Sequence, residues 1–352
     1  MLGLPVVWAD DTLAHVPGVE IWIGVPTPGT ELPERATVIR DAVVAAGASL
    51  LPATSHDDSV LRRVHSDGLL RHLETVYAEW AARGYQEHQH NVVPYVFPTA
   101  GMLDGLPARE PYATHGRAGL YMYDTMTLVG EGTWRAARAA VDAAQTAAEL
   151  VAGGAPASYA ICRPPGHHAT RTAFGGSCYL NNAAVAVETL RSAGVDRVAV
   201  VDIDAHHGNG TQALCYDRPD VFYGSVHVDP GAGWFPHYAG YADETGRGAG
   251  DGCNRNVPLA PGTGDDGWLD GLAAVCAAAA VFRPDAVVVS LGVDAAADDP
   301  ESPLQVTREG YRRSGALIRH IGVPIVAVHE GGYHLPTLGD LTVATLAGLT
   351  GT

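Results

Sequence analysis

Short runs of β-branched residues alternate along this chain with longer, alanine-rich stretches that have helical spacing. We expect strands at Tyr159–Arg163, Arg197–Asp204, Val221–Val228, Ala286–Gly292 and Pro324–His329. We expect helices at Gly132–Ala152, Asn182–Ala193, Trp268–Phe282 and Thr307–Ile321. Strands that alternate with helices form mostly parallel sheets covered by helices on both faces. The sequence therefore predicts an α/β fold in one domain, residues 1–352, built as three layers around an open sheet.

The composition of the chain argues against some classes of binding partner. The formal charge is −17 and the chain contains no lysine, so its surface repels nucleic acid and anionic membranes, and we expect neither as a partner. No uninterrupted apolar run reaches the length of about 18 residues that predicts a membrane-spanning helix. The N-terminus lacks the basic start of a signal peptide. Five dispersed cysteines without CxxC spacing favour a reduced, cytoplasmic protein, and the richness in Ala, Gly, Pro and Arg is typical of a bacterial one.

The segment Val200–Gln212, VVDIDAHHGNGTQ, places two aspartates and two histidines on and just after an apolar run. In a strand, Asp202, Asp204 and His206 would share one face, because side chains alternate with a period of two. Carboxylates and an imidazole at a strand end suit a divalent metal that keeps open coordination positions. Buried carboxylates without a cation or a partner cost several kcal/mol. Taken alone, the segment could also form a structural ion pair.

Four more polar motifs stand at the ends of expected strands, where open α/β sheets bind ligands. They are CRPPGHHAT with His167 and His168, the glycine-containing FGGSCYLNN, SLGVDAAADDP with Asp294, and EGGYH with Tyr333. Together with Val200–Gln212 they supply metal ligands, a histidine pair and a phenol. That set suits metal-assisted hydrolysis.

These motifs carry a family resemblance. With GTW at Gly132–Trp134, FPHYAGYADETG at Phe235–Gly246 and LGVD at Leu291–Asp294, the chain resembles the arginase-fold, zinc-dependent deacetylases. That family includes histone deacetylases and acetylpolyamine amidohydrolases, and the likeness to the bacterial amidohydrolases is greatest. It extends from about Leu61 to the C-terminus.

The resemblance implies roles for the motif residues. Zinc would be bound by Asp204, His206 and Asp294, with positions left for water and the substrate carbonyl. His168 would be general base and then general acid, with Asn209 as its neutral partner. His167, paired with Asp202, would act electrostatically, and Tyr333 would stabilise the oxyanion. The family pattern also implies one or two structural potassium ions. The resemblance places the first at Asp202, Asp204, His206, Ser225 and Val226, and a second near Cys215, Arg218 and Val221.

The substrate positions depart from the family pattern. Phe235 matches one aromatic wall of the substrate tunnel, but Ser177, after Gly176, stands where the other wall is commonly aromatic. His115 and Met126 stand where polyamine-cleaving relatives carry glutamates. Glu301, where a gatekeeping glutamate can occur, and Asp124 are candidate contacts for a cationic substrate, although both could be solvated surface acids.

The segment of residues 84–119 is rich in proline, histidine and aromatic residues and has little periodicity. It resembles the insertion through which the amidohydrolases form dimers and narrow their entrance. We expect a homodimer through this segment, the alternative being a loop packed on its own subunit.

The expected activity is zinc-dependent hydrolysis of N-acetyl or related acyl amides of amines such as acetylpolyamines. A protein acetyl-lysine deacetylase and a biosynthetic deacylase of a specialised metabolite are the alternatives. A non-catalytic binding protein on the same fold is disfavoured because Asp204, His206, Asp294, His168 and Tyr333 are all present. An arginase-like ureohydrolase is disfavoured because its two-manganese site needs more bridging carboxylates.

Overall fold

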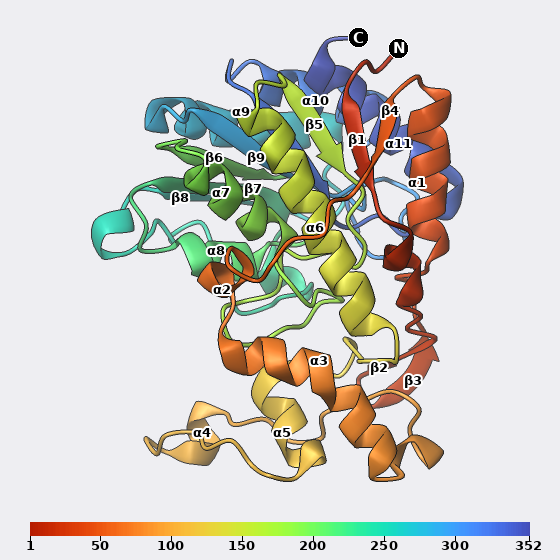
Figure 1. Cartoon of the computed structure of the whole chain (residues 1–352). Helices are drawn as coiled ribbons and strands as arrows, with labels where there is room; N and C mark the ends of the chain where they lie inside the picture. The colour runs from red at the N-terminus through yellow and green to blue at the C-terminus, as the bar shows by residue number, and fades with distance from the viewer.

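An eight-stranded parallel sheet forms the centre of the computed structural model, which describes residues 1–352 (Figure 1). Its strand order is β4-β1-β5-β10-β9-β6-β7-β8. The strands are β1 (Pro5–Trp8), β4 (Ser49–Pro52), β5 (Ala157–Ala160), β6 (Val198–Asp202), β7 (Val221–Val228), β8 (Asn254–Leu259), β9 (Ala286–Leu291) and β10 (Ile325–His329). The predicted fold class is confirmed.

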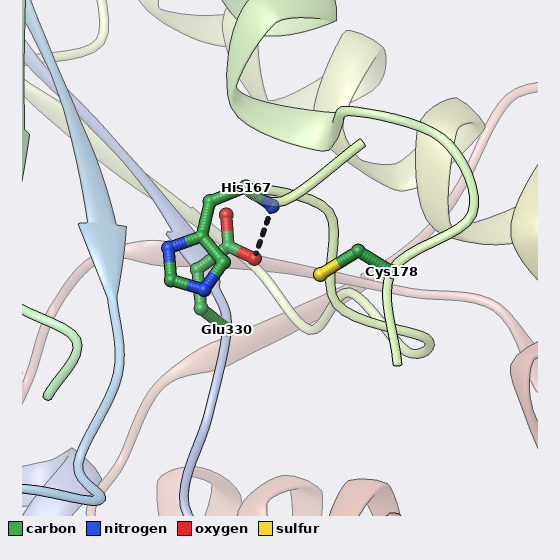
Figure 2. Close-up of side chains that lie close together, drawn as sticks. All are labelled: His167, Cys178 and Glu330. Atoms are coloured by element: carbon green, nitrogen blue, oxygen red, sulfur yellow. Dashed lines mark hydrogen bonds between the residues drawn. The ribbon is translucent and has the colours of Figure 1, made fainter. Parts of the chain in front are cut away.

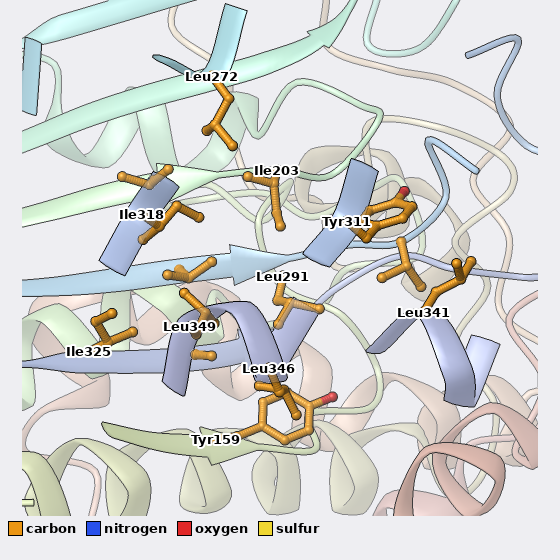
Figure 3. Packing of buried hydrophobic residues seen from close by; sticks show 14 of the residues in the cluster. Tyr159, Ile203, Leu272, Leu291, Tyr311, Ile318, Ile325, Leu341, Leu346 and Leu349 are labelled. Atoms are coloured by element: carbon orange, nitrogen blue, oxygen red, sulfur yellow. The ribbon is translucent and has the colours of Figure 1, made fainter. Parts of the chain in front are cut away.

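Helices cover both faces of this sheet. One face carries α6 (Thr133–Ala152) and α7 (Asn182–Ser192), and the other carries α1 (Glu34–Ala45), α9 (Asp265–Phe282), α10 (Arg308–Arg319) and α11 (Leu335–Thr350). The buried side chains on the α6–α7 face form a first hydrophobic cluster, and those on the face of α1, α9, α10 and α11 form a second. Side chains of β6 alternate between the two: Val198 and Val200 belong to the first cluster, and Ala199 and Val201 to the second. Figure 3 shows the second cluster, in which Leu291 of β9 packs with side chains of α10 and α11. Because both faces of the central sheet are buried, its inner strands are apolar at consecutive positions in the sequence.

The remaining elements lie beyond the edge at which the strands end (Figure 1). They are the antiparallel hairpin β2 (Val19–Trp22) and β3 (Val25–Pro28), and the helices α2 (Leu61–Val64), α3 (Asp67–Ala82), α4 (Ala100–Leu103) and α5 (Thr114–Tyr121). Helix α8 (Asn209–Cys215) follows the loop after β6, and short 3-10 helices occupy Asp10–Ala14, Tyr85–Glu87, Pro230–Ala232 and Gly248–Gly250. None of the helices combines the length and the hydropathy that a membrane crossing requires.

Two expectations about local structure are corrected. Strand β6 ends at Asp202, so Asp204 and His206 do not continue one strand face. Their backbone amides instead bond to side chains, Asp204 N to Asp202 Oδ1 at 3.1 Å and His206 N to Asp204 Oδ1 at 2.9 Å. Aspartate side chains compete in this way with the ladder of a sheet. The first 60 residues, for which no element was expected, supply β1, β4 and α1 to the central layers.

Candidate active site

Asp204, His206 and Asp294 come together beyond the ends of β6 and β9. Their potential ligand atoms all lie within 4.8 Å of one another. Both carboxylates are buried and held by backbone amides: Gly331 N donates to Asp204 Oδ2 at 2.7 Å, and Ala205 N donates to Asp294 Oδ1 at 2.7 Å. The sequence prediction that these three residues form one cluster is consistent with this geometry.

The orientation of His206 shows what this cluster can hold. Its Nε2 lies 3.0 Å from the carbonyl oxygen of Glu301, so Nε2 carries a proton and donates it. Its Nδ1 then faces two acceptors, Asp294 Oδ2 at 3.1 Å and Asp204 Oδ1 at 3.3 Å. Burial alone would lower the pKa of His206, but these carboxylates raise it well above its usual value. The two carboxylates therefore favour a positive charge at the place that Nδ1 faces, either a proton on Nδ1 or a bound cation. Two carboxylates and one imidazole are a ligand set that suits a divalent metal.

His167 pairs with Asp202 beside this cluster. His167 Nδ1 lies 3.1 Å from Asp202 Oδ2, an oxygen that also accepts from the hydroxyl of Tyr223 at 3.1 Å. Burial would lower the pKa of His167, but the carboxylates of Asp204, Asp202 and Glu330 raise it to about 10. The ion pair with Asp202 therefore favours the protonated form of His167.

His168 has the opposite character. Its ring lies 4.0 Å from that of His167, between centroids, and its Nδ1 lies 2.7 Å from Asn209 Oδ1. Burial and the neighbouring His167 and His206 lower the pKa of His168 well below its usual value. Because an amide oxygen only accepts, Nδ1 carries the proton and Nε2 is free to accept another.

Glu330 supports the histidine pair from beneath. Its Oε2 accepts from Gly166 N at 2.7 Å and from His167 N at 3.1 Å, and its Oε1 accepts from the hydroxyl of Ser290 at 3.2 Å. Figure 2 shows Glu330 next to His167, with the thiol of Cys178 pointing toward them. The backbone that presents His167 and His168 is therefore fixed by a buried carboxylate that the sequence analysis did not single out.

Tyr333 follows two glycines at the end of β10. Its backbone amide donates to Asp299 Oδ2 at 2.7 Å, and the guanidinium of Arg35 lies 4.7 Å from the centre of its ring. Burial raises the pKa of the Tyr333 phenol well above its usual value, although Arg35 opposes the shift. The phenol therefore keeps its proton and can donate a hydrogen bond.

A cavity of about 1070 Å³ leads to His206 and Asn209 from the surface. Two near-parallel aromatic rings, Tyr123 and Phe235, line it with their centroids 6.4 Å apart and an interplanar angle of 11°. Gly176, with φ +58°, lies so close to His168 and Phe235 that a Cβ there would meet their rings at 2.4 and 2.7 Å. Only glycine fits at this position.

The comparisons with known proteins agree with this geometry. The model of the histone deacetylase domain matches residues 30–349. The chain belongs to the histone deacetylase family. This deacetylase is 39% identical over 347 residues to acetylpolyamine amidohydrolase 1 of Pseudomonas aeruginosa, covering 98% of each chain. It is 39% identical over 348 residues to acetylpolyamine amidohydrolase of Mycoplana ramosa, covering 98% of this chain and 99% of the relative.

A solved structure agrees as well. The crystal structure of acetylpolyamine aminohydrolase from Burkholderia pseudomallei superposes with a TM-score of 0.92 at 38% identity, over 98% of each chain. The predicted family and enzyme class are confirmed: this deacetylase is a metal-dependent hydrolase of amide bonds. The likeness begins near residue 30, so its expected start near Leu61 was too late.

The predicted substrate residues of the deacetylase divide into two groups. Phe235, Glu301 and Asp124 line the cavity, whereas Ser177 does not. The Asp124 carboxylate is not free, because it accepts from the amides of Gly176, Met126 and Thr127 at 2.6–3.0 Å.

The two positions at which relatives carry glutamates also differ in where they lie. Met126 lines the cavity, whereas His115 does not and bonds instead to the hydroxyl of Tyr85 at 2.8 Å. His334, the residue after Tyr333, pairs with Asp298 at 3.2 Å.

The predicted potassium residues adjoin one another. Ser225 is the partner of Asp202 in the β6–β7 register, Val226 follows it, and the Ser225 hydroxyl bonds to His227 at 2.7 Å. Near the second predicted site, the Cys215 carbonyl accepts from Arg218 N, three residues before Val221. Potassium at both sites stays a prediction.

Besides Glu330, three residues of the deacetylase were missed by the sequence analysis. Glu20 reaches the cavity from hairpin β2–β3, Tyr123 supplies the ring opposite Phe235, and Asp299 holds the loop of Tyr333. For Glu20 a signal existed, since Gly24 between two runs of β-branched residues is typical of a tight hairpin.

Proposed function

We propose that this deacetylase uses zinc to remove the acetyl group from acetylpolyamines or similar small acylated amines. One observation carries the proposal: the cavity that reaches His206 is lined by the carboxyl groups of Glu20, Asp124 and Glu301 and by no arginine. Because the chain has no lysine, this entrance has no cationic side chain except histidine. A chain with a second, protonated amine fits such an entrance. The names of the amidohydrolase relatives support the same substrate class.

The residues divide the reaction among them. Bound by Asp204, His206 and Asp294, zinc would supply Lewis acidity to the amide carbonyl and to a water molecule. Neutral His168 is placed to accept the proton of the attacking water at Nε2 and then to return it to the leaving amine. Cationic His167, held by Asp202, stabilises negative charge that develops beside it. Tyr333 donates its phenol proton in a hydrogen bond to the carbonyl oxygen as that oxygen becomes anionic.

A substrate panel tests this proposal. We would compare kcat/KM for acetylputrescine, acetylspermidine, an acetyl-lysine peptide, longer acyl analogues, and N-pentylacetamide as a neutral analogue of similar length. We expect the cationic acetylamines to exceed the neutral amide, and zinc removal to abolish turnover of all of them. A preference for the peptide would favour protein deacetylation instead, and a preference for a longer acyl group would favour a biosynthetic deacylase.

We also propose that two copies of the chain associate through residues 84–119. Large apolar side chains are exposed on this segment, including Tyr95, Met102, Leu106 and Tyr112. Trp22 and Ile23 at the tip of hairpin β2–β3 are also exposed and line the cavity. Phe97 of the same segment lines the cavity as well. Exposed aromatic and apolar groups are typical of an interface. Light scattering of the wild type and of Tyr112→Asp would test it, with a dimer expected for the first and a monomer for the second.

A further inference from the structure

Asp299 connects parts of the active site that belong to different loops. It lies in the loop after β9, and only 7% of its surface is exposed. Its Oδ2 accepts from Tyr333 N at 2.7 Å and from His334 N at 3.2 Å. Its Oδ1 accepts from Glu301 N at 3.0 Å. One carboxylate therefore binds three backbone amides, and no role in the reaction has yet been given to it.

Each oxygen of Asp299 leads to a different component of the reaction centre. Oδ1 holds the backbone of Glu301 through the amide of that residue. The Glu301 carbonyl oxygen in turn accepts a hydrogen bond from His206 Nε2, with 3.0 Å between the two atoms. That hydrogen bond sets the direction in which His206 Nδ1 points. The Oδ2 side fixes the backbone of Tyr333, two residues after the Gly331 amide that holds Asp204.

We propose that Asp299 is a positioning residue that aligns the phenol of Tyr333 with the metal ligand His206. Hydrogen bonds to a carboxylate are stronger than those between neutral groups, and three of them leave the side chain no freedom to rotate. Groups that orient a metal ligand typically change metal affinity or activity by 10- to 100-fold when they are lost. The inference rests on the proposed metal-dependent function, and it adds a residue that touches neither metal nor substrate.

The neighbouring Asp298 provides a matched control. Its side chain is 48% exposed and pairs only with the imidazole of His334, at 3.2 Å. Asp298→Asn removes the same charge one residue away while it leaves all three backbone hydrogen bonds in place. An effect of Asp299 that Asp298→Asn reproduces would be an effect of charge alone.

Asp299→Asn separates the two sides of the carboxylate. The carboxamide has one accepting oxygen, and two amides share Oδ2, so we expect that oxygen to stay with Tyr333 and His334. The side-chain nitrogen of the asparagine then faces Glu301 N, and because both groups are donors they cannot form a hydrogen bond. The Glu301 carbonyl is then no longer held in place, and we expect His206 to lose its fixed orientation. We expect the zinc affinity of the purified protein, measured by competition with a chelating dye, to fall about tenfold. We expect kcat at saturating zinc to stay within about threefold of the wild type, since the Tyr333 side is intact.

Asp299→Ala removes both sides and is tested in a double-mutant cycle. We expect kcat at saturating zinc to fall about 10- to 100-fold in the wild-type background, with KM nearly unchanged. In a Tyr333→Phe background the same substitution should lower kcat by less than about threefold, because the phenol is already absent. Equal falls in both backgrounds would overturn the proposed link to Tyr333.

Two further outcomes keep the inference distinct from the proposed function. If Asp299→Ala does not fold, the folded Asp299→Asn decides, and a zinc affinity equal to that of Asp298→Asn overturns the proposal. If the wild type binds no zinc or hydrolyses no acetylated amine, the proposed function itself fails.

Discussion

The carboxylates of the reaction centre all accept hydrogen bonds from backbone amides, whereas only some of the carboxylates at the cavity entrance do. Asp202, Asp204, Asp294 and Glu330 each bond to at least one backbone amide, and all are buried. At the entrance, Asp124 is held by backbone amides, but the Glu301 side chain has no hydrogen-bond donor within the chain. Glu20 arrives there from a separate two-stranded sheet.

This difference separates chemistry from selection of substrate. Groups held by several backbone bonds keep one geometry, which a reaction requires. A carboxylate with no partner in the chain keeps its hydrogen-bonding capacity for an incoming cation. We therefore expect large, substrate-independent effects at the centre and small, charge-dependent effects at the entrance.

Asp294→Ala should have the largest effect, because it removes one of the three metal donors. We expect loss of the bound metal and a fall in kcat/KM on the order of 1000-fold for cationic and neutral amides alike, since Lewis acidity contributes several kcal/mol. Metal analysis and steady-state kinetics measure both. Full activity in a metal-free Asp294→Ala protein would contradict the role of this cluster.

Tyr333→Phe should lower kcat by about 100- to 1000-fold while KM changes little, because the phenol donates mainly to the developing oxyanion. The fall should be equal for cationic and neutral substrates. A larger fall for cationic substrates would move Tyr333 from the reaction centre to the entrance. Unchanged turnover would remove the oxyanion role.

Glu330→Ala should lower the free energy of unfolding by about 1–3 kcal/mol, because the buried amides of Gly166 and His167 lose their acceptor. Glu330→Gln is the control, since its carbonyl oxygen can occupy the place of Oε2 and keep both bonds. Urea unfolding of the two variants measures the difference. Equal stability would show that the carboxylate does not support the histidine pair.

The smallest effects belong to the entrance. Glu301→Gln should raise KM for acetylputrescine about two- to fivefold, as expected for one partly solvated ion pair, and leave KM for N-pentylacetamide unchanged. Equal changes for both substrates would remove Glu301 from substrate selection.

Glu20 adds a pH dependence to this selection. Burial raises its pKa to about 7, helped by the neighbouring carboxylates of Glu301, Glu31 and Asp124 and opposed by the Thr30 amide. A carboxyl group with a raised pKa is charged above that pH and neutral below it. KM for acetylputrescine should therefore rise as the pH falls from about 8 to about 6, where the substrate amine stays protonated. The rise should be absent for N-pentylacetamide and weaker in Glu20→Gln.

The same division explains what the sequence could predict. Asp204, His206, Asp294 and Tyr333 were found because each follows an apolar strand, and strand ends of a parallel sheet meet at one edge. Glu20 was missed because its place beside Glu301, 281 residues later, depends on how a hairpin docks. The wall expected to be missing at Ser177 is a similar case, since Tyr123 faces Phe235 from another loop. Asp299 precedes a proline, a pattern that predicts only a turn.

The position of β10 has a consequence for biosynthesis. This strand is the last of the sheet to be synthesised, yet it lies between β5 and β9 in the middle of the strand order. A nascent chain that lacks it has two incomplete half-sheets, one of β4, β1 and β5 and one of β9, β6, β7 and β8. The enzyme can therefore become active only after β10 and the Tyr333 loop that follows it have been synthesised, and shorter nascent chains expose apolar strand edges on which aggregation can begin.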